Sequence, residues 1–388
     1  MNNSLNQTPQ SERLLIGIFG ERNAGKSTLI NAFTGQDTAL VSPVKGTTTD
    51  PVYKSMELSP IGPVTVVDTA GVDDNADTLG KQRVAKTFDI LRKTDVAILV
   101  SGSEDDSKHS EYEKKLIDTL NAAKIKYITV KNNYYNNFES TIDEIKTKVI
   151  ELIASSEAES EHPLIADLIE QGDIVILVTP IDSGAPKGRL ILPQQGVIRE
   201  TLESQAVPML VQPEGLKAVL NKLKSPPKLV ITDSQAFAKV SAVLNSQKHK
   251  IRLTSFSILF ARYKGVLKRA VQAAKKLDTL QNGDTVVICE GCTHHRQCDD
   301  IGTVKLPRML EKHSGMKLQY KFTSGKTFPA VDELKELKPH LIIHCGGCMQ
   351  SRREILARQE IADKAGIPMC NYGIAIAHIL AIDSLQLI

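Results

Sequence analysis

The segment Leu14-Leu-Ile-Gly-Ile-Phe-Gly20-Glu-Arg-Asn-Ala-Gly-Lys-Ser27 decides the fold of the first part of the chain. Residues 14–19 are almost all apolar and predict a β-strand. The next residues match G-x-x-x-x-G-K-S, and the apolar pattern of Leu29, Ile30 and Phe33 predicts a helix directly behind them. A glycine-rich loop that leads into a helix N-terminus presents backbone N–H groups to a phosphate. The segment therefore predicts a P-loop nucleotide-binding domain.

The residues of this loop predict the phosphate and magnesium contacts. Lys26 is placed to reach the β- and γ-phosphates, and the hydroxyl of Ser27 is placed to bind Mg²⁺. We expect the nucleotide to be held within this loop by Gly20, Asn23, Ala24, Gly25, Lys26, Ser27 and Thr28.

Two further elements predict a nucleotide-dependent switch. A threonine of the loop Gly46-Thr-Thr-Thr-Asp50 is placed to bind Mg²⁺ and to sense the γ-phosphate. The strand that begins at Val64 ends in Asp68-Thr-Ala-Gly71, where Asp68 would hold Mg²⁺ through water and the Gly71 amide would contact the γ-phosphate. Loops that are ordered by a γ-phosphate and released on hydrolysis form switches. The expected catalytic set is Lys26, Thr48, Asp68 and Gly71.

The base-recognition element departs from the usual N-K-x-D pattern. The segment after the strand Tyr127–Val130 reads Lys131-Asn132-Asn-Tyr-Tyr135, in which Asn132 keeps the asparagine and Tyr135 replaces the aspartate. A phenol cannot provide the paired acceptor contact that a carboxylate makes to guanine. The residues thus support phosphate binding and leave guanine specificity open.

The rest of the chain predicts two further α/β domains. Behind the acidic, serine-rich segment 155–161, strand-like and helix-like runs alternate as in a small parallel sheet. A second alternation begins with a predicted strand over Leu253–Leu259 and a helix over Tyr263–Leu280, and it predicts a doubly wound unit. We therefore expect an α/β protein of three domains: a P-loop domain with a mixed, mostly parallel sheet, a small connector or oligomer-interface domain, and a C-terminal doubly wound domain, with the ranges 1–165, 166–250 and 251–388.

All six cysteines lie after residue 288, in loops that follow predicted strands. The run 289–295 reads Cys-Glu-Gly-Cys-Thr-His-His, and the run 344–348 reads His-Cys-Gly-Gly-Cys. Neighbouring parallel strands would bring both runs to one edge of a sheet. Three interpretations of Cys289, Cys292, Cys345 and Cys348 are open. They are a four-coordinate zinc site, an iron–sulfur cluster on three cysteines with an open position, and buried structural thiols.

The bulk composition is typical of a soluble globular protein, and we expect the protein in the cytoplasm. Hydrophobic residues make up 41% and charged residues 24% of the chain, as in globular proteins. The formal net charge of +3 gives no basis for expecting a nucleic-acid or membrane partner. The polar N-terminus shows no signal peptide, and no apolar run is long enough to span a membrane.

The N-terminal motifs resemble the translation-factor-related P-loop GTPases, in the branch of the tRNA-modification and ribosome-assembly GTPases. That resemblance implies GTP and Mg²⁺ as ligands and identifies Thr48 as the switch threonine. In the same branch, an asparagine at the position of Asn23 is associated with activation by K⁺.

The whole chain resembles the [FeFe]-hydrogenase maturation GTPase family, the HydF type. The resemblance rests on C-x-H at Cys292 and His294, a long spacer, and H-C-x-x-C at 344–348, all behind a P-loop domain. It implies a scaffold with a [4Fe–4S] cluster on Cys292, Cys345 and Cys348. It also implies a homodimer whose middle domain dimerises, and a regulatory GTPase domain. The cargo would be a transient di-iron precursor, received from radical-SAM maturases and passed to apo-[FeFe]-hydrogenase.

The fourth position of such a cluster has several candidate ligands, and other functions stay open. The candidates for the fourth ligand or for an orienting role are His294, His344, Cys298 and Asp299. Cys289 and Cys370 are expected to be packed thiols. The alternatives are a ribosome- or tRNA-associated GTPase with a zinc domain, and a redox enzyme that uses the Cys-Gly-Gly-Cys pair as a dithiol.

Overall fold

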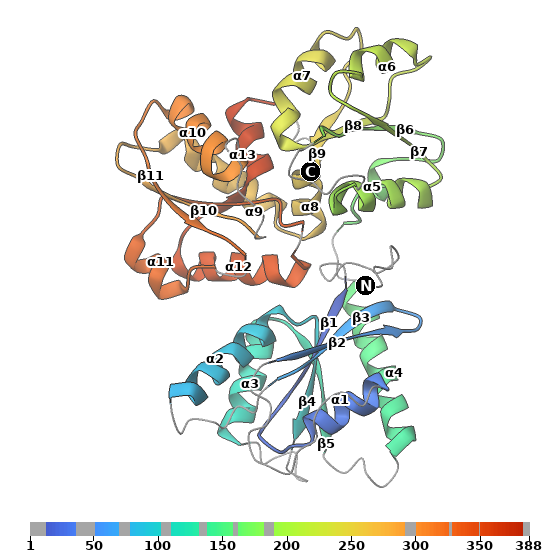
Figure 1. The fold of residues 1–388 in the computed structure, drawn as a ribbon, viewed down its shortest axis with the longest axis vertical. Helices are drawn as coiled ribbons and strands as arrows, with labels where there is room; N and C mark the ends of the chain where they lie inside the picture. Colours follow the sequence, from blue (N-terminus) through green and yellow to red (C-terminus); the bar gives the residue numbers. More distant parts are fainter. Residues whose placement is uncertain are drawn as a thin grey trace. The chain divides into compact units, whose positions relative to one another are not determined.

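A computed structural model of the chain describes residues 13–35, 51–69, 78–101, 110–131, 138–157, 162–181, 190–291, 300–325, 328–348 and 350–382 (Figure 1). The chain forms two compact units, Met1–Glu159 and Ser160–Ile388. The first unit holds the P-loop, and the second holds the cysteine-containing loops. Each unit is a layered α/β structure, as the sequence predicts.

The first unit is built on a five-stranded sheet with the order β2-β3-β1-β4-β5. Only β2 runs antiparallel to its neighbour, so the expected mixed, mostly parallel sheet is confirmed. One face packs on α1 and α4, and the other packs on α2 and α3. The elements are β1 (Leu14–Gly20), α1 (Lys26–Thr34), β2 (Val52–Leu58), β3 (Gly62–Asp68), α2 (Thr78–Lys93), β4 (Val96–Ser101), α3 (Glu111–Ala122), β5 (Lys126–Lys131) and α4 (Phe138–Glu157).

The second unit contains two four-stranded parallel sheets of the same topology. Their orders are β7-β6-β8-β9 and β11-β10-β12-β13, so in each sheet the first strand lies between the second and the third. The first sheet includes η3 (Ala166–Leu168), β6 (Ile174–Val178), α5 (Leu192–Glu203), β7 (Val207–Val211), α6 (Leu216–Lys222), β8 (Leu229–Thr232), η4 (Ser234–Ala236), α7 (Phe237–Asn245), β9 (Leu253–Ser255) and α8 (Phe256–Tyr263).

The second of these sheets carries the cysteine-containing loops. Helices α11 and α12 cover one of its faces, and α9, α10 and α13 cover the other (Figure 1). Its elements are α9 (Leu267–Ala274), η5 (Lys275–Thr279), β10 (Thr285–Cys289), η6 (Ile301–Lys305), α10 (Leu306–Ser314), β11 (Gln319–Thr323), α11 (Val331–Leu337), β12 (Leu341–His344), α12 (Arg352–Ala365), β13 (Met369–Asn371) and α13 (Tyr372–Ile379).

One continuous hydrophobic core joins these two sheets. It contains Ile176 and Val230 of the first sheet, Ile288 and Ile343 of the second, and Ile258 of α8 between them. Apolar side chains that share one water-excluded volume stabilise each other, so the two sheets are coupled in stability.

Two predicted elements differ from the structure. The strand expected over Leu253–Leu259 ends at Ser255, whose hydroxyl accepts a hydrogen bond from the backbone N–H of Ile258 and so begins α8. The helix expected over Tyr263–Leu280 is divided at Gly265, which has a φ of +77°. Strand β9 pairs with β8, so it belongs to the sheet β7-β6-β8-β9, which we call the middle sheet.

The expected domain boundary at residue 250 stays a prediction. Strand β9, which follows this position in the sequence, still belongs to the middle sheet, and α8 continues directly from it. None of the helices in the described ranges combines the length and the apolar composition needed to cross a bilayer.

The shared core gives a test of the coupling between the two sheets. Phe237→Ala removes a fully buried ring from this core and should cost about 3–5 kcal/mol of unfolding free energy. Hydrogen exchange followed by mass spectrometry should then show weaker protection in β10 and β12 as well as in β6 and β8. The control Leu202→Ala changes a side chain that is 56% exposed and should leave protection nearly unchanged. Loss of protection in the middle sheet alone would contradict a shared core.

Candidate functional site

The P-loop has the backbone conformation that phosphate binding requires. Gly20 has a φ of +151°, and a Cβ at this position would lie 2.3 Å from the carbonyl oxygen of Val100. Asn23 has a φ of +60°, and Gly25, the N-cap of α1, has a φ of +89°. These left-handed conformations turn the chain around a small volume in front of the helix N-terminus, where an anion is stabilised.

Lys26 is buried within this loop. Its Nζ donates to the carbonyl oxygens of Gly20, at 3.1 Å, and Glu21, at 2.6 Å. The ammonium is thereby held against the loop that would surround the phosphates. This placement fits the role that the sequence predicts for Lys26, since a fixed cation needs little reorganisation to stabilise phosphate charge.

Ser27 and Asp68, the two residues expected to hold magnesium, are in contact. The hydroxyl of Ser27 donates to Oδ2 of Asp68 at 2.8 Å, and Asp68 stands at the end of β3 with 1% exposure. Within the described residues, Oδ1 of Asp68 is buried without a hydrogen-bond partner. Burial raises the pKa of Asp68, although Ser27 and Lys26 act against this. A buried carboxylate with an unsatisfied oxygen beside a serine hydroxyl is a donor set that suits a hydrated Mg²⁺ ion.

Three of the predicted nucleotide contacts lie outside the described residues. These are Thr48, Gly71 and Asn132. Their roles stay predictions, as does the replacement of the guanine-binding aspartate by Tyr135.

The two cysteine-containing loops begin side by side. Strands β10 and β12 are parallel neighbours, with Cys289 opposite His344. The backbone N–H of Cys345 donates to the carbonyl oxygen of Cys289 at 2.8 Å, and the N–H of Gly291 donates to Sγ of Cys345 at 3.0 Å. The expectation that both loops leave one edge of a sheet is therefore confirmed. An N–H that points at sulfur favours a thiolate, which is the form that binds metal.

His344 is fixed by hydrogen bonds on both ring nitrogens. Its Nδ1 donates to the carbonyl oxygen of Cys345 at 2.7 Å, and its Nε2 lies 2.8 Å from Nη1 of Arg358, which donates to it. Burial, followed by the charges of Arg358 and Lys264, lowers the pKa of His344 to about 3. The ring is thus neutral, and it orients the start of the cysteine loop.

Two buried basic residues contribute contacts here: Arg358 bonds to His344, which precedes this loop, and Lys264 bonds to the loop itself. Arg358 of α12 donates from Nη2 to the carbonyl oxygen of Gly325 at 3.0 Å. Lys264, which follows α8, donates from Nζ to the carbonyl oxygens of Gly347, at 2.6 Å, and Gln350, at 2.9 Å. Burial lowers the pKa of Lys264 to about 8, although Cys348 and Cys345 act to raise it. Burial raises the pKa of Cys345, and the N–H of Gly291 acts against this. The nearby cations would stabilise the thiolate form that a metal requires.

The middle sheet also contributes to this site. The side chain of Asn371 donates to the carbonyl oxygen of Ser257 at 2.8 Å, and a Cβ on Gly346 would lie 3.1 Å from Oγ of Ser257. Ser234 and Ser257 lie within hydrogen-bonding distance, at 3.1 Å. The carboxyl ends of the two parallel sheets therefore meet at the cysteine loop, so its surroundings come from both.

A second polar pair, Tyr372 and Glu290, faces Gly302 of η6. A Cβ on Gly302 would lie 2.3 Å from the hydroxyl oxygen of Tyr372 and 2.6 Å from Oε1 of Glu290. Burial raises the pKa of Tyr372, and the charges of Cys345 and Glu290 add to this. Within the described part of the chain, the buried hydroxyl of Tyr372 has no hydrogen-bond partner. An unsatisfied donor beside a cysteine suits a group with sulfur or other acceptor atoms.

The cysteines themselves fall into three groups. Cys345 and Cys348 are half-buried in one loop. Cys289 and Cys370 are buried, and burial raises the pKa of their thiols to about 11 and about 12, so the expectation of packed thiols is confirmed. The other predicted ligands lie outside the described residues, namely Cys292, His294, Cys298 and Asp299.

Several residues of the site could not be found from the sequence. Lys264, Arg358 and Gln350 stand in ordinary polar positions of helices or turns, and no motif marks them. Their signal is burial of a charged or amide group, and that property exists only in the folded chain.

Sequence profiles of known families match three parts of this chain. Residues 15–133 match the 50S ribosome-binding GTPase domain, residues 164–265 match the hydrogen maturase F dimerization domain, and residues 270–385 match the hydrogen maturase F tetramerization domain. The last two matches together cover most of the second compact unit.

Curated relatives match in the GTPase part. The tRNA modification GTPase MnmE of Helicobacter pylori (strain Shi470) is 41% identical over 118 residues, which are 30% of this chain and 25% of that protein. The MnmE of Legionella pneumophila (strain Corby) is 35% identical over 133 residues, which are 34% of this chain and 28% of that protein. The chain thus spans about a quarter of the length of these relatives.

Solved structures show only weak overall similarity. The Era GTPase of Aquifex aeolicus, bound to GDP and AlF4⁻, has a TM-score of 0.27 and 15% identity, with 83% of this chain and 96% of that one covered. Toc33 of Arabidopsis thaliana, with Mg²⁺ and GMPPNP, has a TM-score of 0.24 and 13% identity, with 37% and 85% covered.

The buried Asp68 gives a prediction that depends on pH. Because its pKa is raised in the folded state, its ionisation destabilises the nucleotide-free protein as the pH rises through that pKa. Asp68→Asn should therefore melt at a higher temperature than the unchanged protein at pH 7, and the difference should shrink toward pH 4 (about the ordinary carboxyl pKa). Magnesium-dependent hydrolysis should be lost.

Differential scanning fluorimetry of nucleotide-free protein measures this difference. Asp89→Asn, which neutralises an exposed carboxylate paired with Lys93, is the matched control and should show little change. A melting difference for Asp68→Asn that is the same at every pH would contradict a raised pKa.

The contacts of Lys264 predict a looser cysteine loop in its absence. Lys264→Met leaves the buried carbonyls of Gly347 and Gln350 without this donor, at a cost of about 1–3 kcal/mol each. Amide exchange in residues 345–350 should become faster, while exchange in β1 should stay the same. Lys268→Met alters an exposed lysine of α9 and serves as the control. Unchanged exchange in the loop would show that Lys264 does not hold it.

Proposed function

Because the chain belongs to the hydrogen maturase F family of hydrogenase-maturation GTPases, we propose that it is a GTP-regulated scaffold for an iron–sulfur cluster and its cargo. The resident group is a [4Fe–4S] cluster, and the cargo is a di-iron precursor of the hydrogenase active site. The precursor comes from radical-SAM maturases and passes to apo-[FeFe]-hydrogenase. The working form is a cytoplasmic homodimer.

The observation that carries this proposal is the paired start of the two cysteine-containing loops. Cys289 faces His344 in the register of β10 and β12, so the segment toward Cys292 leaves the sheet beside Cys345. The N–H of Gly291, which donates to Sγ of Cys345, suits a sulfur-rich anionic group. So does the hydroxyl of Tyr372, which has no hydrogen-bond partner among the described residues. The residues present therefore fit the cluster that the family implies.

We assign the ligands Cys292, Cys345 and Cys348 to the cluster. When bound, the cluster supplies an iron whose fourth ligand can be exchanged for an atom of the cargo. His344 orients the loop, because both of its ring nitrogens are already engaged. The exchangeable position then falls to a residue of the segment 292–299, for which His294, Cys298 and Asp299 are the candidates.

The surrounding residues support a carrier that both protects and releases. Lys264 and Arg358 offset the charge of the thiolates, and both are almost fully buried. A small cavity lined by Lys264, His344, Cys345 and Asn371 lies behind the loop. Cationic and amide donors around a metal centre stabilise negative charge there and raise its reduction potential.

The GTPase part serves as the regulator in this proposal. Lys26 and Ser27 bind the phosphates and Mg²⁺, and Thr48, Asp68 and Gly71 form the switch that changes on hydrolysis. Asn23 is the position at which K⁺ would act. The switch biases the exchange of protein partners, while the metal cargo is handled in the second unit.

A pair of single substitutions tests the proposal. Cys345→Ala should reduce iron from about four atoms per chain to less than half, with GTP hydrolysis nearly unchanged. Lys26→Ala should slow hydrolysis by about 100-fold or more, because a charge-stabilising donor is removed, with iron content unchanged. Iron, sulfide and zinc are measured after anaerobic reconstitution, together with the EPR spectrum of the reduced cluster.

Two outcomes would overturn this assignment. Stoichiometric zinc that is lost in Cys345→Ala, with no iron uptake by the unchanged protein, would replace the scaffold by a GTPase with a zinc domain. Loss of both iron and hydrolysis in each variant would show that the two parts do not act as separate modules.

A further inference from the structure

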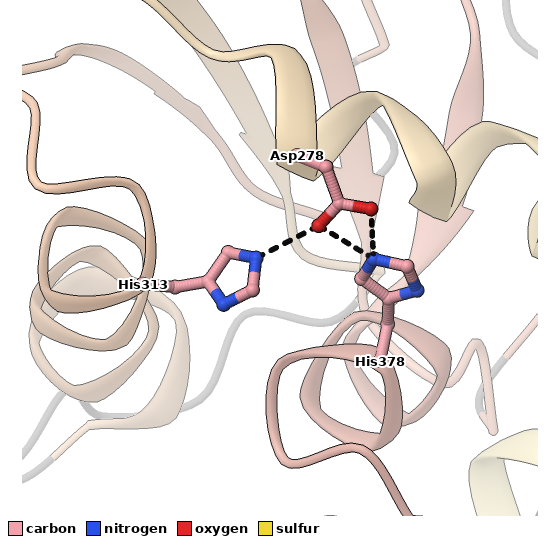
Figure 2. A group of neighbouring side chains, drawn as sticks. All are labelled: Asp278, His313 and His378. Atoms are coloured by element: carbon pink, nitrogen blue, oxygen red, sulfur yellow. Dashed lines mark hydrogen bonds and ion pairs between the residues drawn. The ribbon is translucent and has the colours of Figure 1, made fainter.

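A second group of side chains of the types that bind metals lies on helices that pack against the cysteine-bearing sheet, away from the cysteines. Asp278 of η5, His313 of α10 and His378 of α13 point toward one another (Figure 2). Nε2 of His313 lies 3.0 Å from Oδ1 of Asp278, and Nε2 of His378 lies 3.0 Å from Oδ1 and 2.9 Å from Oδ2. Two imidazoles thus converge on one carboxylate, and the three side chains come from three different elements.

The spacing of these atoms fits a metal ion. One nitrogen of each histidine and a carboxylate oxygen all lie within 4.8 Å of one another. Zinc bonds to nitrogen and oxygen of about 2.0–2.2 Å place tetrahedral ligands roughly 3.3 Å apart. The present contacts are slightly shorter than this, so a small outward rotation of the side chains makes room for an ion.

The backbone around these side chains is held by the hydrophobic core. Leu277, next to Asp278, is fully buried, and Leu310 and Ile374 are buried in the helices that carry the two histidines. The two imidazole rings stand edge to face, with 6.1 Å between their centroids. A site whose ligands come from packed helices loses less conformational entropy on binding an ion than a site on free loops.

The electrostatics of the group also favour a cation. Hydrogen bonds from His378 and His313 hold the pKa of Asp278 below its ordinary value, so its carboxylate is charged at neutral pH. The group is partly exposed: 53% of the Asp278 side chain, 24% of that of His313 and 22% of that of His378 are accessible. Water can therefore reach and complete the coordination sphere.

We propose that Asp278, His313 and His378 bind one divalent transition-metal ion of the zinc class. Two imidazoles and one carboxylate favour Zn²⁺, Co²⁺ or Ni²⁺ over Mg²⁺ or Ca²⁺, which prefer all-oxygen ligands. Three protein ligands leave at least one position for water. The bound ion ties η5, α10 and α13 together on one face of the sheet.

This site is separate from the cysteine loops. Residue Asp278 precedes β10, and His313 precedes β11, so both lie at the edge where these strands begin. The two cysteine-containing loops follow β10 and β12, so they lie at the opposite, carboxyl ends of the strands. An ion at the histidine site therefore neither needs nor replaces the group on the cysteines.

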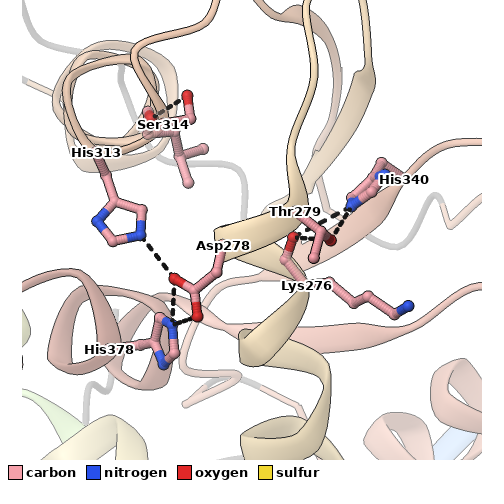
Figure 3. Close-up of polar contacts among 8 residues, drawn as sticks. Lys276, Asp278, Thr279, His313, Ser314, His340 and His378 are labelled. Carbon is pink, nitrogen blue, oxygen red and sulfur yellow. Dashed lines mark hydrogen bonds and ion pairs between the residues drawn. The ribbon is translucent and has the colours of Figure 1, made fainter.

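A neighbouring histidine provides a matched control. His340 lies on the other side of η5 (Figure 3), where its Nε2 is 3.2 Å from Oγ1 of Thr279 and 3.1 Å from the carbonyl oxygen of Lys276. Its Nδ1 is 3.2 Å from Oδ2 of Asp284. It has a similar exposure and a carboxylate partner, but it does not face Asp278.

The test compares zinc binding in the full chain and its variants. The double variant His313→Gln, His378→Gln keeps side-chain donors for Asp278 but loses both imidazole ligands. Removing even an outer partner of a metal ligand weakens binding about 10–100-fold, so this variant should lose one bound Zn²⁺ per chain with an affinity drop of ~100-fold or more. His340→Gln should bind as the unchanged protein does. Equilibrium dialysis against Zn²⁺ with metal analysis gives both numbers.

Two further measurements keep the result interpretable. Thermal unfolding without metal should be nearly the same for all variants, while added Zn²⁺ should raise the melting temperature only of the unchanged protein and His340→Gln. With Co²⁺, the absorption lost in the double variant should lack thiolate-to-metal charge transfer. Equal zinc binding in the double variant, or a lost signal of thiolate type, would overturn the proposal.

Discussion

The parallel pairing of β10 with β12 is the constraint on which the cysteine-containing part of this protein depends. It places Cys289 opposite His344, so that two segments more than 50 residues apart leave the sheet at adjacent points. The register of this pairing is strongly specified. A slip of one residue between the two strands would turn every buried side chain of the slipped strand toward the wrong face of the sheet. Val287 and Ile342 point into one core and Ile288 and Ile343 into another, which fixes the register.

Around that edge, the chain buries several polar and charged groups, and each has a structural function. Lys264 reaches the cysteine loop from the end of α8, and Ser257 contacts Asn371, so the middle sheet helps to shape a site whose ligands it does not supply. A buried ammonium is costly unless its hydrogen bonds are satisfied, and here two backbone carbonyls satisfy them. The part of the chain that matches the dimerization domain, residues 164–265, therefore contacts the cysteine loop directly through Lys264.

At the nucleotide site, in contrast to the cysteine loop, a buried charged group is left partly unsatisfied. The ionised carboxylate of Asp68 is unfavourable in the nucleotide-free state, since burial raises its pKa and one oxygen has no partner among the described residues. A magnesium ion that enters with the nucleotide would supply the missing positive charge. Sites that are strained when empty and satisfied when loaded are suited to switches, because binding free energy is then coupled to a change of conformation.

The sequence by itself determined the order of the domains, the P-loop and the pairing of a strand with each cysteine loop, because these depend on short-range patterns: G-x-x-x-x-G-K-S, alternating apolar runs and the C-x-x-C spacing. It misplaced the end of β9, where the Ser255 cap begins a helix, and it missed the break at Gly265, which has a positive φ. Both features override apolar periodicity. Only the tertiary structure decided that Lys264 and Arg358 are buried beside the cysteines, that His344 has both nitrogens engaged, and that Asp278, His313 and His378 meet. Such contacts join residues up to 100 positions apart, and they arise from the packing of helices on sheets, which no local pattern encodes.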